Sequence, residues 1–222
     1  MEAQHIPGII RAASNLSVAL PLLAYVFRAG YASRQIHVIG LLIILSGLAD
    51  ATGFILLQSG TSTVVLLNAY YIVLFVLLSW FYYEVLAEKV HRLVLIAGSV
   101  TYVVSFILIS LYVQGITEYQ TLMWVITAVI MIIYSISYFF YSVSTISSAA
   151  FYGFSLIWIN VGVMIYFCLN LFLFVMGNYI LTRLDSETSA LIWSSHNINN
   201  IIKNLLFAIG IYMHKGKVTQ FG

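Results

Sequence analysis

The sequence predicts an all-α polytopic membrane protein, built as one bundle of seven transmembrane helices. Its 222 residues are 62% hydrophobic and only 7% charged, and the mean hydropathy is +1.03. A soluble domain would carry about a quarter charged residues, so lipid must be the main solvent of this chain. Since one spanning helix needs about 20 apolar residues, a chain of this length holds about seven spans with short connections.

Seven apolar runs, each bounded by charges, glycines or polar turns, mark the expected helices. They cover roughly residues 9–29, 37–58, 63–85, 93–114, 120–142, 152–176 and 190–213. The clearest break is the polar segment 183–189, which cannot lie in hydrocarbon. We expect a single domain over residues 1–222. The first run should be kept as a helix, because it lacks the basic start and cleavage signature of a signal peptide.

The distribution of Lys and Arg predicts which way the bundle faces. Six basic residues fall where a seven-helix topology puts one side of the membrane: Arg28, Arg34, Lys89, Arg92, Lys215 and Lys217. Arg11 and Arg183 fall on the other side. Because short cytoplasmic loops are rich in basic residues, we expect the amino terminus outside and the carboxyl terminus in the cytoplasm.

Several classes of function do not fit this composition. A net charge of only +2, from scattered basic residues, argues against nucleic-acid binding. Cys168 lies alone in an apolar run, and His196 is the one histidine expected deep within a helix, so no metal site is predicted. No HExxH or GxSxG motif occurs, and Ser194 and Ser195 point to other helix faces than His196. An enzyme is therefore the weaker interpretation, and we expect no catalytic residues.

The last expected helix carries a stripe of polar side chains. At about 100° per residue, one face collects His196, Asn199, Asn200, Lys203 and Asn204. The opposite face is apolar, with Ile198, Ile201, Ile202, Leu205 and Leu206. Because polar groups are costly in hydrocarbon, we expect the stripe to face the bundle interior and the apolar face to meet lipid.

Polar residues of other helices lie at a similar depth. Counted at about 1.5 Å per residue, Asp50 and His196 reach nearly one level in the outer half of the membrane, and Asn15, Asn68 and Asn170 fall within about a turn of it. We expect a pocket there, open to the outside. The candidate ligand-binding residues are Asp50, Asn68, Asn170, His196, Asn199, Asn200 and Lys203.

Asp50 and Lys203 invite a direct ion pair. Side chains lean toward the amino end of their helix, so these two lean toward each other across a depth difference of roughly 7 Å. An unpaired charge at this depth costs at least about 2.5 kcal/mol, so we expect pairing, or else neutralisation of both. The structural alternative is that the polar groups, the asparagines above all, only join helices through hydrogen bonds of about 0.6 kcal/mol each.

Three stretches resemble a group of small, uncharacterised bacterial seven-helix membrane proteins. They run from Tyr70 to Tyr83, from Ile157 to Phe174 and from Trp193 to Gly210, the last with His196 and Asn200. The resemblance implies the seven-helix architecture and a multi-pass location in the bacterial cell (inner) membrane. It implies no activity.

Lys203 also suggests a distant similarity to microbial rhodopsins, whose retinal is bound as a Schiff base to a lysine in the seventh helix. Such proteins place an acidic counterion in the middle of helix three, where this chain has Tyr70 and Tyr71, and usually a proline in helix six, which is missing here. Only Asp50 could serve as the counterion. Retinal at Lys203 is therefore disfavoured, and we expect no cofactor.

Together these features favour a receptor-like or signalling membrane protein with an outward-facing polar pocket for an unknown small ligand. Since no cytoplasmic domain is expected, its signal would pass through a partner in the membrane or cytoplasm. The alternative is a small-solute or ion-coupled transporter, in which Asp50 and His196 bind and release a proton. A structural membrane subunit is the further alternative, and it requires a polar layer that is dry and fully paired.

Overall fold

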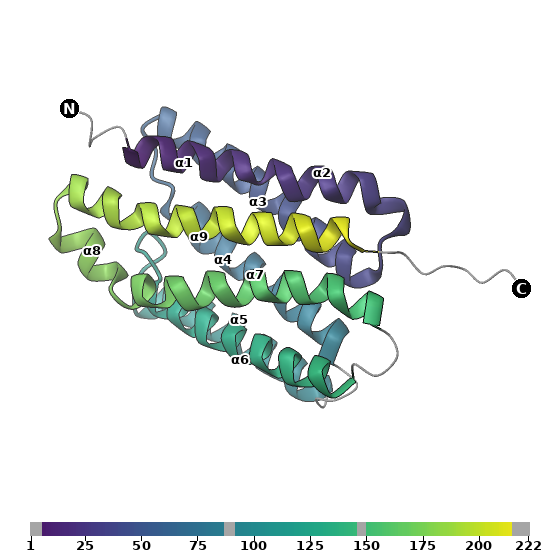
Figure 1. Cartoon of the computed structure of the whole chain (residues 1–222). Helices are drawn as coiled ribbons and strands as arrows, with labels where there is room; N and C mark the ends of the chain where they lie inside the picture. The colour runs from purple at the N-terminus through teal and green to yellow at the C-terminus, as the bar shows by residue number, and fades with distance from the viewer. Residues whose placement is uncertain (1–5, 87–91, 146–149, 215–222) are drawn as a thin grey trace, which may run out of the picture.

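The computed structural model describes residues 6–86, 92–145 and 150–214, and these ranges form helices without any strand (Figure 1). The helices are α1 (Ile6–Ser17), α2 (Ala19–Arg28), the 3₁₀ turn η2 (Ala29–Tyr31), α3 (Arg34–Gln58), α4 (Val64–Leu86), α5 (Arg92–Tyr112), α6 (Thr121–Thr145), α7 (Ala150–Val175), α8 (Gly177–Arg183) and α9 (Ser186–Tyr212). The predicted all-α class is confirmed, and every predicted run overlaps one of these helices.

Two local features differ from the predicted runs. The first run is divided at Val18, between α1 and α2. Pro21 follows and has no N–H to donate to the Ser17 carbonyl, which weakens the helix at this point. The polar segment 183–189 was expected to separate two helices, but α9 already begins inside it, because Asp185 accepts hydrogen bonds from the N–H groups of Glu187 and Thr188 at 3.1 and 2.9 Å. These bonds hold the pKa of Asp185 below its usual range.

Among the described residues, six segments are long and apolar enough to cross a membrane, the pattern of a multi-pass membrane protein. They are Ile6–Tyr31, Arg34–Gln58, Val64–Leu86, Arg92–Tyr112, Thr121–Val143 and Ser155–Val175. Helix α9 has a comparable length of 27 residues. Its polar stripe lowers its hydropathy, so it is not among the six.

The helices close into a ring. Helix α9 lies between α1 and α2 on one side and α7 on the other (Figure 1). From α7 the ring continues through α6, α4 and α3 back to α2, while α5 packs outside the ring against α4. In this arrangement α9, the most polar long helix, is held between the first span (α1 and α2) and α7.

Two glycines lie where α7 and α9 approach each other closely. A Cβ at Gly210 of α9 would lie 2.7 Å from Ile159 Cγ1 and 2.8 Å from the Ser155 carbonyl oxygen of α7. A Cβ at Gly162 of α7 would lie 3.0 Å from the Phe207 ring of α9. Small residues let membrane helices approach each other closely, so these two glycines allow the tight α7–α9 contact.

One end of the bundle carries Arg28, Arg34 and Arg92, and we call it the basic end. Arg34 pairs with Glu84 at 3.1 Å. Arg11 and Arg183 lie toward the opposite end, here the pocket end, as the predicted separation requires. The other basic residues of that prediction, Lys89, Lys215 and Lys217, lie outside the described residues.

Candidate ligand-binding site

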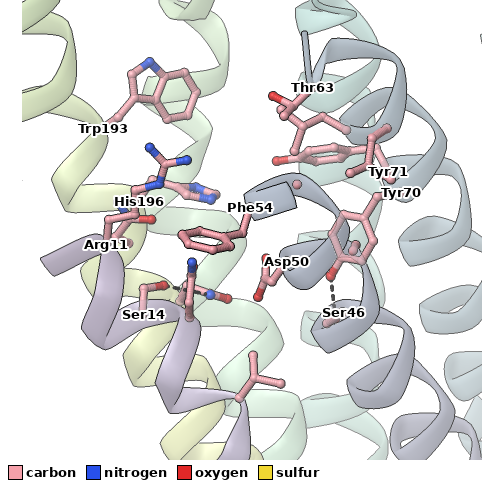
Figure 2. A pocket seen from close by; sticks show the side chains of 18 of the residues that line it. Arg11, Ser14, Ser46, Asp50, Phe54, Thr63, Tyr70, Tyr71, Trp193 and His196 are labelled. Carbon is pink, nitrogen blue, oxygen red and sulfur yellow. Dashed lines mark hydrogen bonds between the residues drawn. The ribbon is translucent and has the colours of Figure 1, made fainter. Parts of the chain in front are cut away.

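A cavity of about 340 Å³ opens at the pocket end, among α1, α3, α4, α6, α7 and α9 (Figure 2). Its polar wall comprises Arg11, Ser14, Asn15, Ser46, Asp50, His196, Asn197, Asn200 and Lys203, and its aromatic wall comprises Phe54, Tyr70, Tyr71, Tyr119, Trp124, Tyr166 and Trp193. The volume lies within the roughly 300–1,000 Å³ of small-molecule pockets. Four of the lining residues have ionisable side chains: Arg11, Asp50, His196 and Lys203. The cavity is therefore rich in polar groups for a membrane protein.

Of the predicted site residues, the structure brings Asp50, His196, Asn200 and Lys203 to the cavity wall. Asn68, Asn170 and Asn199 do not line it. Binding of a ligand by the first four stays a prediction. The other three form hydrogen bonds to groups within the protein, outside the cavity wall.

Asn170 and Asn199 lie behind His196. Asn170 Oδ1 accepts a hydrogen bond from Asn199 Nδ2 at 3.2 Å and lies 3.1 Å from His196 Nδ1, while Asn170 Nδ2 donates to the Tyr166 carbonyl at 2.7 Å. Because that donation fixes which end of the amide is oxygen, His196 Nδ1 must be the donor. In the neutral ring, Nε2 is then the remaining acceptor. Asn170 thus positions the imidazole.

Asn68 holds a loop. Its Nδ2 donates to the carbonyls of Ile116 and Glu118 at 3.3 and 2.8 Å, and its Oδ1 accepts from the Gln120 N–H at 3.3 Å. These partners lie in the connection between α5 and α6. Asn68 therefore holds this loop against α4 at the pocket end, and its own side chain does not line the cavity.

The polar stripe of α9 faces inward, as predicted. Asn200 Nδ2 donates to Ser14 Oγ at 3.0 Å, and Asn204 Nδ2 donates to Ser17 Oγ at 2.7 Å. Ile198 and Leu205 are exposed on the opposite face. These two bonds join α9 to α1, so part of the stripe fulfils the structural role that was the alternative explanation.

The prediction that Leu206 faces lipid holds only in part, because this side chain is half-buried. Its Cβ would lie 3.3 Å from a Cβ placed on Gly162. Helix α7 therefore covers this side of α9, and the lipid-facing strip is narrower than the helical wheel indicates.

The predicted Asp50–Lys203 ion pair is wrong as a direct contact. No nitrogen–oxygen distance between these two residues is 4.0 Å or less. Lys203 Nζ instead lies 4.7 Å from the centroid of the Tyr166 ring, within the range of a cation–π interaction. The lysine stem turns toward α7, and the two charges face the cavity from separate walls.

Arg11 is a charged wall residue that the sequence reading left at the membrane surface. It lies on α1 with Ser14 and Asn15, at the spacing i, i+3, i+4 of one helix face. Figure 2 shows Arg11 and Ser14 of α1 across from Asp50 and Phe54 of α3. That spacing was the available signal, because it is the same pattern that identified the stripe of α9.

The aromatic wall was not predicted. Tyr71 stacks on Trp124 with ring centroids 4.7 Å apart, and Trp193 contacts His196 edge to face at 5.6 Å. Tyr166 also lies edge to face with His196, at 5.6 Å. These rings come from four helices, and no spacing in the sequence groups them. Tyr166 and Trp193 thus place aromatic rings against two sides of the imidazole.

No protein-family model matches this chain, and neither a curated protein nor a solved structure matches it. The resemblance to small bacterial seven-helix proteins stays an expectation. Within the described ranges, no three His, Cys, Asp or Glu side chains gather in a group that could hold a metal ion.

Proposed function

We propose that this chain is a seven-span, receptor-like membrane protein that binds a small ligand in the cavity at its pocket end. The pocket end faces the outside of the cell membrane, and the signal passes to a partner protein at the basic end. The observation that carries the proposal is a polar cavity that is open at one end and closed at the other.

Large, fully buried side chains close the bundle between the cavity and the basic end. Ile39 of α3, Phe81 and Tyr82 of α4, and Phe207 of α9 are each at most 2% exposed. They lie between the cavity and the basic end. A channel would need a continuous polar path here, so the closed half favours ligand binding over conduction.

The seventh span rests on α9. Its 27 residues extend about 40 Å at 1.5 Å per residue, which exceeds a hydrocarbon core of about 30 Å. Its polar side chains point to neighbouring helices or to the cavity, so lipid meets mainly apolar groups. With seven spans, the excess of arginines at the basic end supports a cytoplasmic side for that end, and the proposed location is the cell (inner) membrane of a bacterium.

Helix α9 offers a route for the signal. His196, Asn200 and Lys203 line the cavity, and the same helix ends at the basic end. There His214 Nε2 accepts a hydrogen bond from the Ser33 N–H at 3.2 Å. A ligand that displaces α9 would therefore also change the turn between α2 and α3, where a partner could detect it.

Cysteine labelling in sealed, oriented membranes tests the proposal. In a Cys168→Ser background, Asn197→Cys places a thiol on the cavity wall, Ser135→Cys places one in the closed half, and Leu205→Cys places one on the lipid-facing side. A membrane-impermeant anionic thiosulfonate reagent should modify Asn197→Cys from outside only. The other two should stay unmodified.

Each other outcome favours a specific rival. Modification of Asn197→Cys from both sides would indicate alternating access and a transporter. Modification from the cytoplasmic side alone would reverse the orientation. No modification from either side would mean a dry, paired polar layer and a structural subunit.

A further inference from the structure

A second cavity lies beside the first, as a groove between α1 and α3. Its volume is about 830 Å³. The walls are mostly small or apolar, with Gly8, Ala12 and Leu16 on α1 and Gly47, Ala51 and Leu57 on α3. Such a surface is suited to a hydrocarbon chain.

The groove follows from the path of the first span. Helix α1 packs on α9, whereas α2, after the break at Val18, packs on α3 as well. The pocket-end halves of α1 and α3 are thereby held apart. Neither helix fills the space, since a Cβ at Gly8 would have no neighbour within 4 Å and one at Gly47 would meet only Val18, at 3.4 Å.

The groove and the polar cavity are continuous. Arg11, Asn15, Asp50, Phe54 and Leu57 line both. Phe54 is 59% exposed and lies where the two spaces meet, between α1 and α3 (Figure 2). A molecule could therefore place one part among the polar residues and another part in the groove.

The charges of the polar cavity determine which head group fits there. Arg11 and Lys203 supply two cationic groups, and Asp50 supplies one carboxylate. With all three ionised, the cavity carries an uncompensated positive charge. Arginine is the side chain best shaped to bind a carboxylate or phosphate group through two hydrogen bonds.

We infer that the ligand of this site is a single-chain amphiphile with an anionic head group, of the fatty-acid class, which enters from the membrane between α1 and α3. The head group binds beside Arg11 and Lys203, and the tail lies in the groove. The inference rests on the proposed function for the cavity. A water-soluble anion would leave the apolar groove unused, and a neutral lipid would leave the cations unpaired.

Quenching of tryptophan fluorescence tests this in nanodiscs of zwitterionic phosphatidylcholine. The protein carries Trp80→Phe and Trp158→Phe, so that only Trp124 and Trp193, both on the cavity wall, report. The probe is 5-doxylstearic acid, whose nitroxide lies near the head group, and its methyl ester is the uncharged control. We expect saturable quenching by the acid that excess stearate reverses and acetate does not, and only weak, non-saturable quenching by the ester.

Variants test the contributions of the head group and of the tail to binding separately. Arg11→Gln should weaken binding of the acid about tenfold, the loss expected for a hydrogen bond to a charged group, whereas Arg183→Gln should leave it unchanged. Ala51→Phe and Ala12→Phe, which project into the groove from its two sides, should also weaken binding. Both alanines are exposed, so these variants should fold, as gel filtration and thermal unfolding would verify.

Two results would overturn the inference. Equal binding of acid and ester, or equal effects of Arg11→Gln and Arg183→Gln, would show that the site does not require an anionic head group. Displacement by acetate together with unchanged binding in both phenylalanine variants would make the site one for soluble anions. In either case, labelling of Asn197→Cys from outside would still support the proposed function, so the two failures can be told apart.

Discussion

Replacing Gly210 by alanine tests the close packing of α9 on α7. The added Cβ would lie 2.7 Å from Ile159 Cγ1 and 2.8 Å from the Ser155 carbonyl oxygen, where ordinary contacts begin near 3.4 Å. One side chain and one backbone would have to move by a few tenths of an ångström or more. Overpacking of this kind costs about 1–3 kcal/mol, against a gain in helix propensity of at most about 1 kcal/mol.

Gly98→Ala in α5 is the matched control, because its Cβ would meet nothing nearer than Tyr134 Oη at 3.9 Å. It should gain propensity without a clash. We therefore expect Gly210→Ala to have a free energy of unfolding about 1–3 kcal/mol below that of Gly98→Ala, measured by reversible denaturation in micelles. Equal stability of the two variants would refute the close α7–α9 contact.

Two further predictions concern the ends of the bundle. His214 is buried and lies near Arg28, and both effects lower its pKa. The unfolded chain therefore takes up the proton first, so stability should fall as the pH drops below about 6.5, the ordinary pKa of histidine. Thermal unfolding between pH 7.5 and 5.5 should show a smaller loss for His214→Asn. Asn68→Leu strands the polar groups that Asn68 binds and should cost about 1–3 kcal/mol of stability, with faster hydrogen exchange in residues 113–120; unchanged exchange would contradict this role.

Much of the helical architecture could be predicted from the sequence, because hydrophobic length and polar boundaries are local properties. The helix α8 (Gly177–Arg183) was missed because seven residues are too few for a spanning run. The early start of α9 depends on one cap, Asp185, whose polar side chain was taken as a sign of a loop. Both features fall at ends of elements, where composition alone does not distinguish a short helix from a connection.

The candidate site was predictable only where one helix supplied a pattern. The stripe of α9 and the depth of Asp50 identified four wall residues. Depth along a helix does not give rotation about its axis, however, so Asn68 and Asn170 were placed on the wall although they point to a loop and to His196. Arg11 was left out because a charge near the amino terminus was assigned to the membrane surface.

The same limit applies to Asp50 and Lys203, and a double-mutant cycle tests the corrected geometry. A direct buried pair loses about 3–5 kcal/mol when one partner is removed. Charges that face each other across a polar cavity interact much more weakly, by about 1 kcal/mol or less. Since no nitrogen–oxygen distance between the two is 4.0 Å or less, we expect the coupling energy between Asp50→Asn and Lys203→Met in the free energy of unfolding to be about 1 kcal/mol or less.

Asn204 and Ser17 give the positive control, because they share a hydrogen bond of 2.7 Å. Their coupling energy should be near the average of about 0.6 kcal/mol for polar pairs between membrane helices. A coupling of about 3 kcal/mol between Asp50 and Lys203 would show that the two charges do meet directly. Additivity would leave both side chains free to act on a ligand, and Lys203→Met should then weaken binding of 5-doxylstearic acid while Asp50→Asn, which removes the one nearby carboxylate, should strengthen it.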